Sequence, residues 1–120
     1  MMIIAITAQG PDPDSLVDQR FGRAYWILFY DRDKDRWDAM ENTASRNASQ
    51  GAGILAAQQL ADRRAEVLVT GMTGPKAFRA LQAAGIQVLH GATGTAREAL
   101  QAYRQGTLTE ATAELATGLR

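Results

Sequence analysis

The residues of this chain that could do chemistry gather in short glycine-containing segments, most of which follow a predicted strand. These segments are residues 18–23, 51–53, 71–75 and 91–95. The last three each open a predicted helix, so they bring backbone N–H groups and helix N-termini, which suit an anionic ligand. In an α/β domain such loops meet at one edge of the sheet. Almost no catalytic side chain accompanies them, so the pattern favours a binding protein over an enzyme.

The same segments supply charged and polarisable side chains. Arg20 and Arg23 flank Phe21 and Gly22, and two guanidinium groups so close together predict an anion clamp, with a pair of surface arginines as the alternative. Phe21 could instead anchor the core, Met72 could cover it, and the glycines could serve turns alone. The residues that we predict to contact the ligand are Arg20, Phe21, Gly22, Arg23, Gly71, Met72, Thr73, Gly74, Gly91, Thr93 and Gly94.

His90 is the single histidine and ends a predicted strand beside the last of these segments. An imidazole there predicts a metal ligand or a pH-sensitive group, and the alternative is a structural side chain with its hydrogen bonds satisfied. No second histidine and no cysteine is present to complete a metal site. The absence of cysteine also excludes disulfides, thiolate ligands and a cysteine nucleophile.

The composition is that of one globular domain. The chain has 120 residues, 46% of them apolar, which predicts a single domain over residues 1–120 with its core in 2–106. Lys and Arg total 13, as do Asp and Glu, so the chain has no electrostatic footprint for nucleic acid or an anionic membrane. No apolar run approaches the ~20 residues of a membrane span, and no basic region typical of a signal peptide begins the chain, so we expect a cytoplasmic protein.

The elements that position these segments are predicted from hydrophobic periodicity and from capping signals. The order β-β-β-α-β-α-β-α predicts an α/β fold with a mixed five-stranded sheet and helices on both faces. Strands are expected over residues 2–8, 24–30, 36–41, 66–70 and 86–89, and helices over 51–64, 75–84 and 95–105, with a short C-terminal helix or tail over 107–120.

Helix faces and helix ends can be predicted in more detail. Thr95 and Glu98 have the spacing of a capping box, and Thr107 and Glu110 repeat it. Strands 24–30 and 36–41 hold more aromatic side chains than one face of a sheet buries, which predicts either a homodimer surface or core beneath a helix. These aromatic residues are Trp26, Phe29, Tyr30 and Trp37. The residues expected to face inward from helix 51–64 are Ile54, Leu55, Ala57, Leu60 and Ala61.

Several motifs together resemble those of a known family. They are residues 15–24, 51–54, 70–81, 85–86 and 91–95. In this order, and over about residues 2–106, they resemble the dinitrogenase iron-molybdenum cofactor biosynthesis family. The resemblance implies a ribonuclease-H-like motif fold and a cytoplasmic role in metallocofactor biosynthesis and nitrogen fixation. It also implies the binding of an anionic iron–sulfur or iron–molybdenum cofactor, or of a precursor, with cofactor donor and acceptor proteins as partners.

One position departs from the family pattern. In the nitrogenase-dedicated members the residue before Phe-Gly is often a histidine, a candidate cluster ligand, whereas this chain has Arg20. A guanidinium stays protonated and does not ligate iron, although it can hold an anion by charge. The departure therefore favours electrostatic holding of a cluster over direct coordination.

Three enzyme classes do not fit the sequence. A ribonuclease-H-type nuclease needs carboxylates that converge on divalent metals, including one from the first strand, and residues 2–8 contain none. The lone His90 has no serine in a nucleophile-elbow context, and no Lys-Ser/Thr pair follows the glycines as in a P-loop. We therefore expect no catalysis but a binding or carrier protein for an anionic metallocofactor, with a small-anion or nucleotide-sensing regulatory domain as the alternative.

Overall fold

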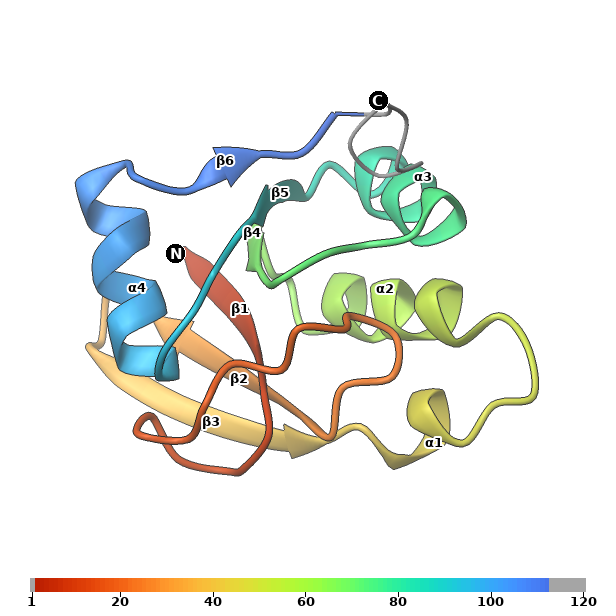
Figure 1. The fold of residues 1–120 in the computed structure, drawn as a ribbon, viewed down its shortest axis with the longest axis horizontal. Helices are drawn as coiled ribbons and strands as arrows, with labels where there is room; N and C mark the ends of the chain where they lie inside the picture. Colours follow the sequence, from red (N-terminus) through yellow and green to blue (C-terminus); the bar gives the residue numbers. More distant parts are fainter. Residues whose placement is uncertain (1, 113–120) are drawn as a thin grey trace.

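The computed structural model describes residues 2–112 and shows one mixed sheet with helices on both of its faces (Figure 1). The chain runs from three strands into alternating helices and strands. The strands are β1 (Ile3–Ala8), β2 (Trp26–Asp31), β3 (Arg36–Glu41), β4 (Val67–Val69), β5 (Gln87–His90) and β6 (Thr109–Glu110). The helices are α1 (Thr43–Arg46), α2 (Ala52–Asp62), α3 (Pro75–Ala83) and α4 (Ala96–Gln105).

The sheet has the strand order β3-β2-β1-β4-β5-β6. The three central strands β1, β4 and β5 are parallel. Helix α3 connects β4 to β5, and α1 and α2 lead from the hairpin of β2 and β3 to β4. Hairpin strands β2 and β3 extend one edge in antiparallel fashion, and β6 pairs antiparallel with β5 at the other. The carboxyl ends of β1, β4 and β5 therefore open onto the same edge, as the sequence predicts for the glycine-rich loops.

The sheet has six strands, so the prediction of five is wrong. The additional strand, β6, lies in the segment expected to be a C-terminal helix or tail, where the spacing of Thr107 and Glu110 resembles a capping box. Leu89 pairs with Glu110 and His90 with Thr109, so the unpaired edge of β5 takes up this segment as a strand. The rest of the predicted C-terminal helix, residues 113–120, lies outside the described residues.

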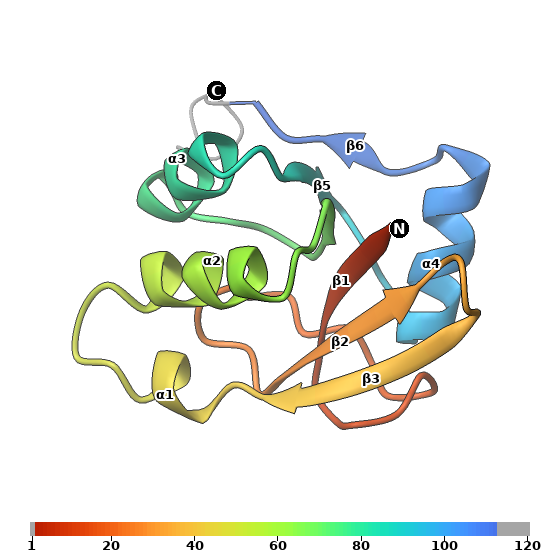
Figure 2. The same cartoon turned by 180° about the vertical axis from the view of Figure 1, so that it is seen from behind.

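Two apolar cores, one on each face, hold the helices to the sheet. On one face Ala5, Phe29 and Leu68 of the sheet pack with α2 and α3, while on the other Ile4, Ile6 and Val69 pack with α4. Figures 1 and 2 show α1, α2 and α3 on one side of the sheet and α4 on the other. The prediction of helices on both faces is thus confirmed, since both pleat faces of the central strands are apolar.

The aromatic residues of the hairpin divide between these cores. Phe29 is buried under the helical layer of α2 and α3, and Tyr30 is buried on the face of α4. Trp37 packs on Tyr30 with the rings tilted by 54° and their centroids 5.1 Å apart, and Trp26 packs partly buried against the same core. This arrangement fits the core interpretation of these side chains, and the homodimer stays a prediction.

Helix α2 buries only part of the face expected to point inward. Ala57 and Leu60 are buried as predicted, whereas Ile54 and Leu55 are 48% and 37% exposed and the prediction for them is wrong. The close approach of α2 and α3 explains the difference, because a Cβ at Gly53 would lie 2.6 Å from the Cβ of Ala77. Small residues are thus required where the two helices meet, and the larger Ile54 is turned towards solvent.

Helix α1 is a single turn in a segment that the sequence predicts to be a loop, so this prediction is wrong. Asn42, the N-cap of α1, is fully buried and donates from Nδ2 to the carbonyl oxygens of Ala24 (2.9 Å) and Gly22 (3.4 Å). Ser45 Oγ contacts the carbonyl oxygens of Gly22 (2.9 Å) and Ala52 (2.6 Å). The turn therefore ties the 21–24 loop to the start of α2. Among residues 2–112 no helix is long and apolar enough to cross a membrane.

Candidate functional site

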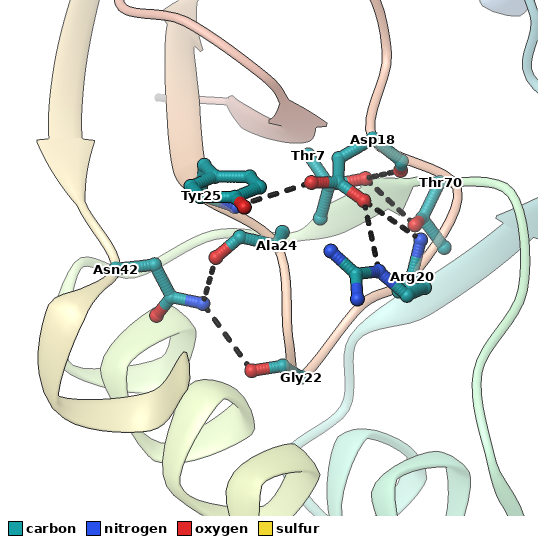
Figure 3. Close-up of polar contacts among 8 residues, drawn as sticks. All are labelled: Thr7, Asp18, Arg20, Gly22, Ala24, Tyr25, Asn42 and Thr70. Carbon is teal, nitrogen blue, oxygen red and sulfur yellow. Dashed lines mark hydrogen bonds and ion pairs between the residues drawn. The ribbon is translucent and has the colours of Figure 1, made fainter. Parts of the chain in front are cut away.

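The loop between β1 and β2 is shaped by a buried carboxylate (Figure 3). Asp18 is only 3% exposed, and its two oxygens accept hydrogen bonds from the backbone N–H groups of Arg20 (3.1 Å) and Tyr25 (3.2 Å). The Nε of Arg20 lies 3.6 Å from the same carboxylate. A carboxylate that accepts several N–H groups fixes a loop in one conformation, so Asp18 sets the course of residues 18–25.

Two threonines join this loop to the ends of the central strands. Thr7, near the end of β1, donates from its hydroxyl to the carbonyl oxygen of Asp18 at 2.7 Å. Its Oγ1 also lies 2.7 Å from the Oγ1 of Thr70, which follows β4. Both threonines are fully buried. Neither threonine is among the predicted site residues, although a hydroxyl residue at the end of an otherwise apolar strand indicates a buried polar contact.

Arg20 lies beside the segment that follows β4. Its backbone forms a bridge to Met72, and the Met72 N–H donates to the carbonyl of Gln19 at 3.0 Å. A Cβ at Gly71 would overlap Gln19, so only glycine permits this approach. The side chains of Arg20 and Met72 are 61% and 53% exposed. The structure thus brings Arg20, Gly71 and Met72 together on the surface. Arg23 lines a depression that does not include Arg20, so the clamp of Arg20 with Arg23 stays a prediction.

A depression of about 350 Å³ lies between the N-termini of α2 and α3. Its lining comes from the 22–23 loop and from the first turns of the two helices: Gly22, Arg23, Gly51, Ala52, Gly53, Ile54, Gly74, Pro75, Lys76 and Ala77. Glycine is the N-cap of both helices, so no side chain accepts from their first N–H groups, and neither first turn contains an acidic residue. Two positive helix ends therefore share one hollow, with Arg23 and Lys76 beside them.

Close packing holds this depression in shape. A Cβ at Gly22 would lie 2.6 Å from the backbone N of Gly53, so the 21–24 loop rests directly on α2. Arg23 donates from one terminal nitrogen to the carbonyl oxygens of Arg46 and Ala48, both at 2.7 Å. One terminal nitrogen of the Arg23 guanidinium is therefore occupied by bonds that fix the edge of the depression. Phe21 is buried in the core among α2 and α3, so its side chain does not reach a ligand in the depression.

His90 has a structural partner at the end of β5. Its Nε2 accepts a hydrogen bond from the backbone N–H of Thr73 at 3.1 Å and lies 2.9 Å from the Thr73 hydroxyl. An Nε2 that accepts places the imidazole proton on Nδ1. Burial lowers the pKa of His90, which favours the neutral ring. His90 and the buried Thr73 therefore hold the 71–74 segment in place, and the nitrogen that would bind a metal is already engaged.

The segment before α4 is arranged differently from those before α2 and α3. The hydroxyl of Thr95 accepts from the Glu98 N–H and the Glu98 carboxylate accepts from the Thr95 N–H, which confirms the predicted capping box. The N–H groups of Ala96 and Arg97 donate to loop carbonyls. Gly91, Thr93 and Gly94 line a separate hollow that includes Glu98, so the structure does not bring them into the depression beside Gly22 and Gly74.

The donors at this edge suit an anion that keeps its own metal ligands. Among residues 2–112 no group of three or more His, Asp or Glu side chains could hold a metal ion. Backbone N–H groups and the side chains of Arg20, Arg23 and Lys76 bind by charge and hydrogen bonding. An anionic cluster bound here as cargo would be held from outside its coordination sphere.

Fold and site together define a small α/β domain whose glycine loops leave two helix N-termini open at one edge. The family model for the dinitrogenase iron-molybdenum cofactor matches residues 2–106. The chain belongs to this family, and the resemblance seen in the sequence is confirmed. No curated protein matches the chain.

Solved structures agree with this assignment. The chain is 48% identical to the apo form of the orange protein from Desulfovibrio gigas, with a TM-score of 0.89 over 93% of this chain and 94% of that one. It is 34% identical to a protein from Thermotoga described as a NifB candidate of the DUF35 family, with a TM-score of 0.83 over 100% and 98% of the two chains. A candidate dinitrogenase from Methanocaldococcus jannaschii shares the fold at 11% identity and a TM-score of 0.67, over 92% and 95%.

Proposed function

We propose that this protein is a non-catalytic carrier of an anionic metallocofactor, either an iron–molybdenum cofactor or an iron–sulfur precursor of it. One observation carries the proposal: the uncapped N-termini of α2 and α3 share a depression that also contains Arg23 and Lys76. Membership of the dinitrogenase iron-molybdenum cofactor family supports the choice of cargo. A cytoplasmic location and a place in nitrogen fixation belong to the same proposal.

The proposed binding mode follows from the donors. N–H groups of the first turns of α2 and α3 would point at the anion, and the two helix dipoles would add to the positive field. Lys76 lies in the first turn of α3, where a cation is unfavourable for the helix itself, so an anionic partner would relieve that repulsion. Arg20, exposed at the neighbouring Met72 bridge, would extend the positive surface.

Binding by charge also fits a carrier role. A cargo held without cysteine or histidine ligation can leave intact, because no metal–protein bond has to break on transfer to an acceptor protein. The absence of a carboxylate cluster among the described residues gives a hydrolytic metal centre no support in this chain. The protein would therefore bind, protect and release its cargo.

The test uses substitutions at Gly74, whose φ of −81° and open surroundings accept a side chain without strain. Gly74→Asp caps α3 and adds negative charge, Gly74→Asn caps it without charge, and Gly74→Ala adds only a methyl group. Each variant and the wild type would be mixed anaerobically with purified iron–molybdenum cofactor, separated by gel filtration and analysed for iron and molybdenum.

We expect the wild type and Gly74→Ala to elute with the cofactor, and Gly74→Asn to retain less of it. Gly74→Asp should lose at least tenfold in affinity, because the charge repels the cluster while the cap occupies its donors. Equal retention by the wild type and Gly74→Asp would remove this depression from the proposal. No retention by the folded wild type would remove the cargo itself.

A small-anion or nucleotide-sensing role is the second candidate. The observation in its favour is the modest size of the depression, about 350 Å³, which lies at the small end of ligand pockets. Uncapped helix N-termini bind phosphate as readily as other anions. A rise in Tm with phosphate or nucleotides but none with the metallocofactor, lost in Gly74→Asp, would favour this role.

A further inference from the structure

A second cavity lies away from the glycine loops. It has a volume of about 540 Å³ and is bounded by the start of β5, the end of β2, and the C-terminal turn of α4 with the segment leading to β6. Figure 1 shows α4 across the sheet from α2 and α3, and β6 at the edge of the sheet beside β5. The cavity is therefore a separate site from the depression beside Gly74.

Strong hydrogen-bond donors in this cavity have weak acceptors. The Nη1 of Arg32 and the hydroxyl of Tyr103 both approach the sulfur of Met2, at 3.8 and 3.6 Å. A thioether is a poor acceptor, and here a guanidinium and a phenol share one. The shared contact also shows that Arg32 and Tyr103 converge on one place, although Arg32 follows β2 and Tyr103 belongs to α4.

Arg104 adds a second cation that forms no ion pair with a carboxylate among residues 2–112. Its Nη2 donates to the hydroxyl of Tyr30 at 2.8 Å, and its guanidinium lies over the Tyr30 ring at 5.3 Å. Tyr30 in turn donates to Asp35 at 2.6 Å, a bond that raises the pKa of the phenol and keeps it protonated. Within residues 2–112 neither Arg32 nor Arg104 forms an ion pair with a carboxylate.

Apolar side chains form one part of the cavity, beside the polar Gln87 at the start of β5. Ile4 and Leu89 are buried side chains of the sheet that line it, and Leu108 covers it from the segment before β6. The last turn of α4 is closed by N–H groups of Gly106 and Thr107, which donate to the carbonyls of Tyr103 and Ala102. Those carbonyls are therefore satisfied and do not need the arginines.

We propose that this cavity binds a small organic anion, with one phosphate or carboxylate group on an apolar or aromatic body. The anionic group lies between Arg32 and Arg104, within reach of the Tyr103 hydroxyl, and the body lies against Ile4, Leu89 and Leu108. Arginine suits both head groups, because its planar fork of donors pairs with two oxygens at once. The site is independent of the metallocofactor proposal.

Four probes distinguish binding of the anionic group from binding of the apolar part of the ligand. They are phenyl phosphate, phenylacetate, inorganic phosphate and benzyl alcohol. Binding to the full chain would be followed by the backbone amide shifts of Leu89, Gly106 and Leu108, with Gly53 and Gly74 as reporters of the other site. We expect phenyl phosphate, phenylacetate or both to shift the first set saturably. Their affinity should exceed that of inorganic phosphate and of benzyl alcohol by about tenfold or more.

The variants Arg32→Gln and Arg104→Gln should each weaken that binding about tenfold, and Tyr103→Phe should weaken it less. The matched control Arg36→Gln removes an arginine of β3 that is paired with Asp38 at the surface, and it should change nothing. Both arginines are exposed, so their variants are expected to fold. No saturable shift at 20 mM probe, on the order of the weakest specific binding, would overturn the proposal. So would shifts confined to Gly53 and Gly74, or equal binding by Arg32→Gln, Arg36→Gln and the wild type.

Discussion

The N-termini of α2 and α3 differ from that of α4, although all three follow glycine-rich loops of similar appearance. At α2 and α3 the N-cap is glycine and no acidic side chain stands in the first turn. At α4 the N-cap is Thr95, and Glu98 completes a capping box. The first turns of α2 and α3 have no side-chain cap, whereas α4 uses its donors within the chain. Glycine loops of similar sequence therefore differ in the donors they leave free, according to whether the helix after the loop has its own cap.

The largest effect on the free energy of unfolding is expected at Gly22, where the 21–24 loop touches the backbone of α2. In Gly22→Ala the new methyl group would lie 2.6 Å from Gly53 N and 2.9 Å from Ala52 C, both backbone atoms that cannot turn aside. We expect a loss of about 1–3 kcal/mol in the free energy of unfolding, measured by urea denaturation, together with loss of the depression. As a control, Gly91→Ala meets no atom within 4 Å and carries only the strain of a φ of +85°. A larger loss at Gly91 than at Gly22 would contradict this account.

The capping box of α4 should matter for stability and not for the cargo. Thr95→Ala removes the hydroxyl that accepts from Glu98 N–H at 3.1 Å and should cost about 1 kcal/mol in the free energy of unfolding. Retention of the cofactor in anaerobic gel filtration should equal that of the wild type. A Thr95→Ser variant, which keeps the cap, is the control. Loss of cofactor binding in Thr95→Ala, with Thr95→Ser unaffected, would place α4 in the binding site after all.

The reverse result is expected at α3. Gly74→Asp gives α3 the cap that α4 already has, so its Tm should rise, by an amount equivalent to about 0.5–1 kcal/mol, as cofactor binding falls. Stability and binding then change in opposite directions at one residue. The control Gly74→Ala offers no cap and should not raise the Tm. A drop in Tm for Gly74→Asp would mean that the N–H groups of α3 are not free to be capped.

The smallest effect concerns pH. Burial holds the pKa of His90 below its ordinary 6.5, so below that pH the unfolded chain binds a proton that the folded chain does not. His90 thus favours the fold fully above about pH 6.5, and stability is lost as the pH falls towards the lowered pKa. Urea denaturation of the wild type between pH 5 and 7 should show this slope. His90→Gln keeps an acceptor for the Thr73 N–H and should flatten it; an unchanged slope would assign it to other groups.

Much of the fold can be predicted from the sequence, because local signals and tertiary structure agree there. The apolar runs before each glycine loop are strands, Pro75 begins α3, and Thr95 with Glu98 caps α4. The ribonuclease-H-like fold name stays a prediction. Strand β6 was missed because two residues that complete an open edge carry no periodic pattern of their own. Helix α1 was missed because buried contacts of Asn42 and Ser45 hold its single turn.

The sequence predicts several residues of the candidate site, but it does not predict which of them lie together in space. Glycines at 22, 71 and 74 stand at this edge as expected, and Arg20 is exposed beside Met72. The sequence does not show that the capping box leaves the 91–94 segment apart from the depression, because helix propensity gives no information on which N–H donors remain free. The burial of Phe21 and the bonds of Arg23 to two carbonyls depend on chain segments more than 20 residues away.

The contact between Gly22 and Gly53 also bears on how fast a ligand would enter. Because the 21–24 loop rests on α2 without space between them, we expect the depression to keep its open form before an anion arrives. The association rate would then depend on diffusion and on the local positive field alone. It would fall as ionic strength rises, while the dissociation rate would change little. An anion would therefore enter the depression faster in dilute salt than in concentrated salt.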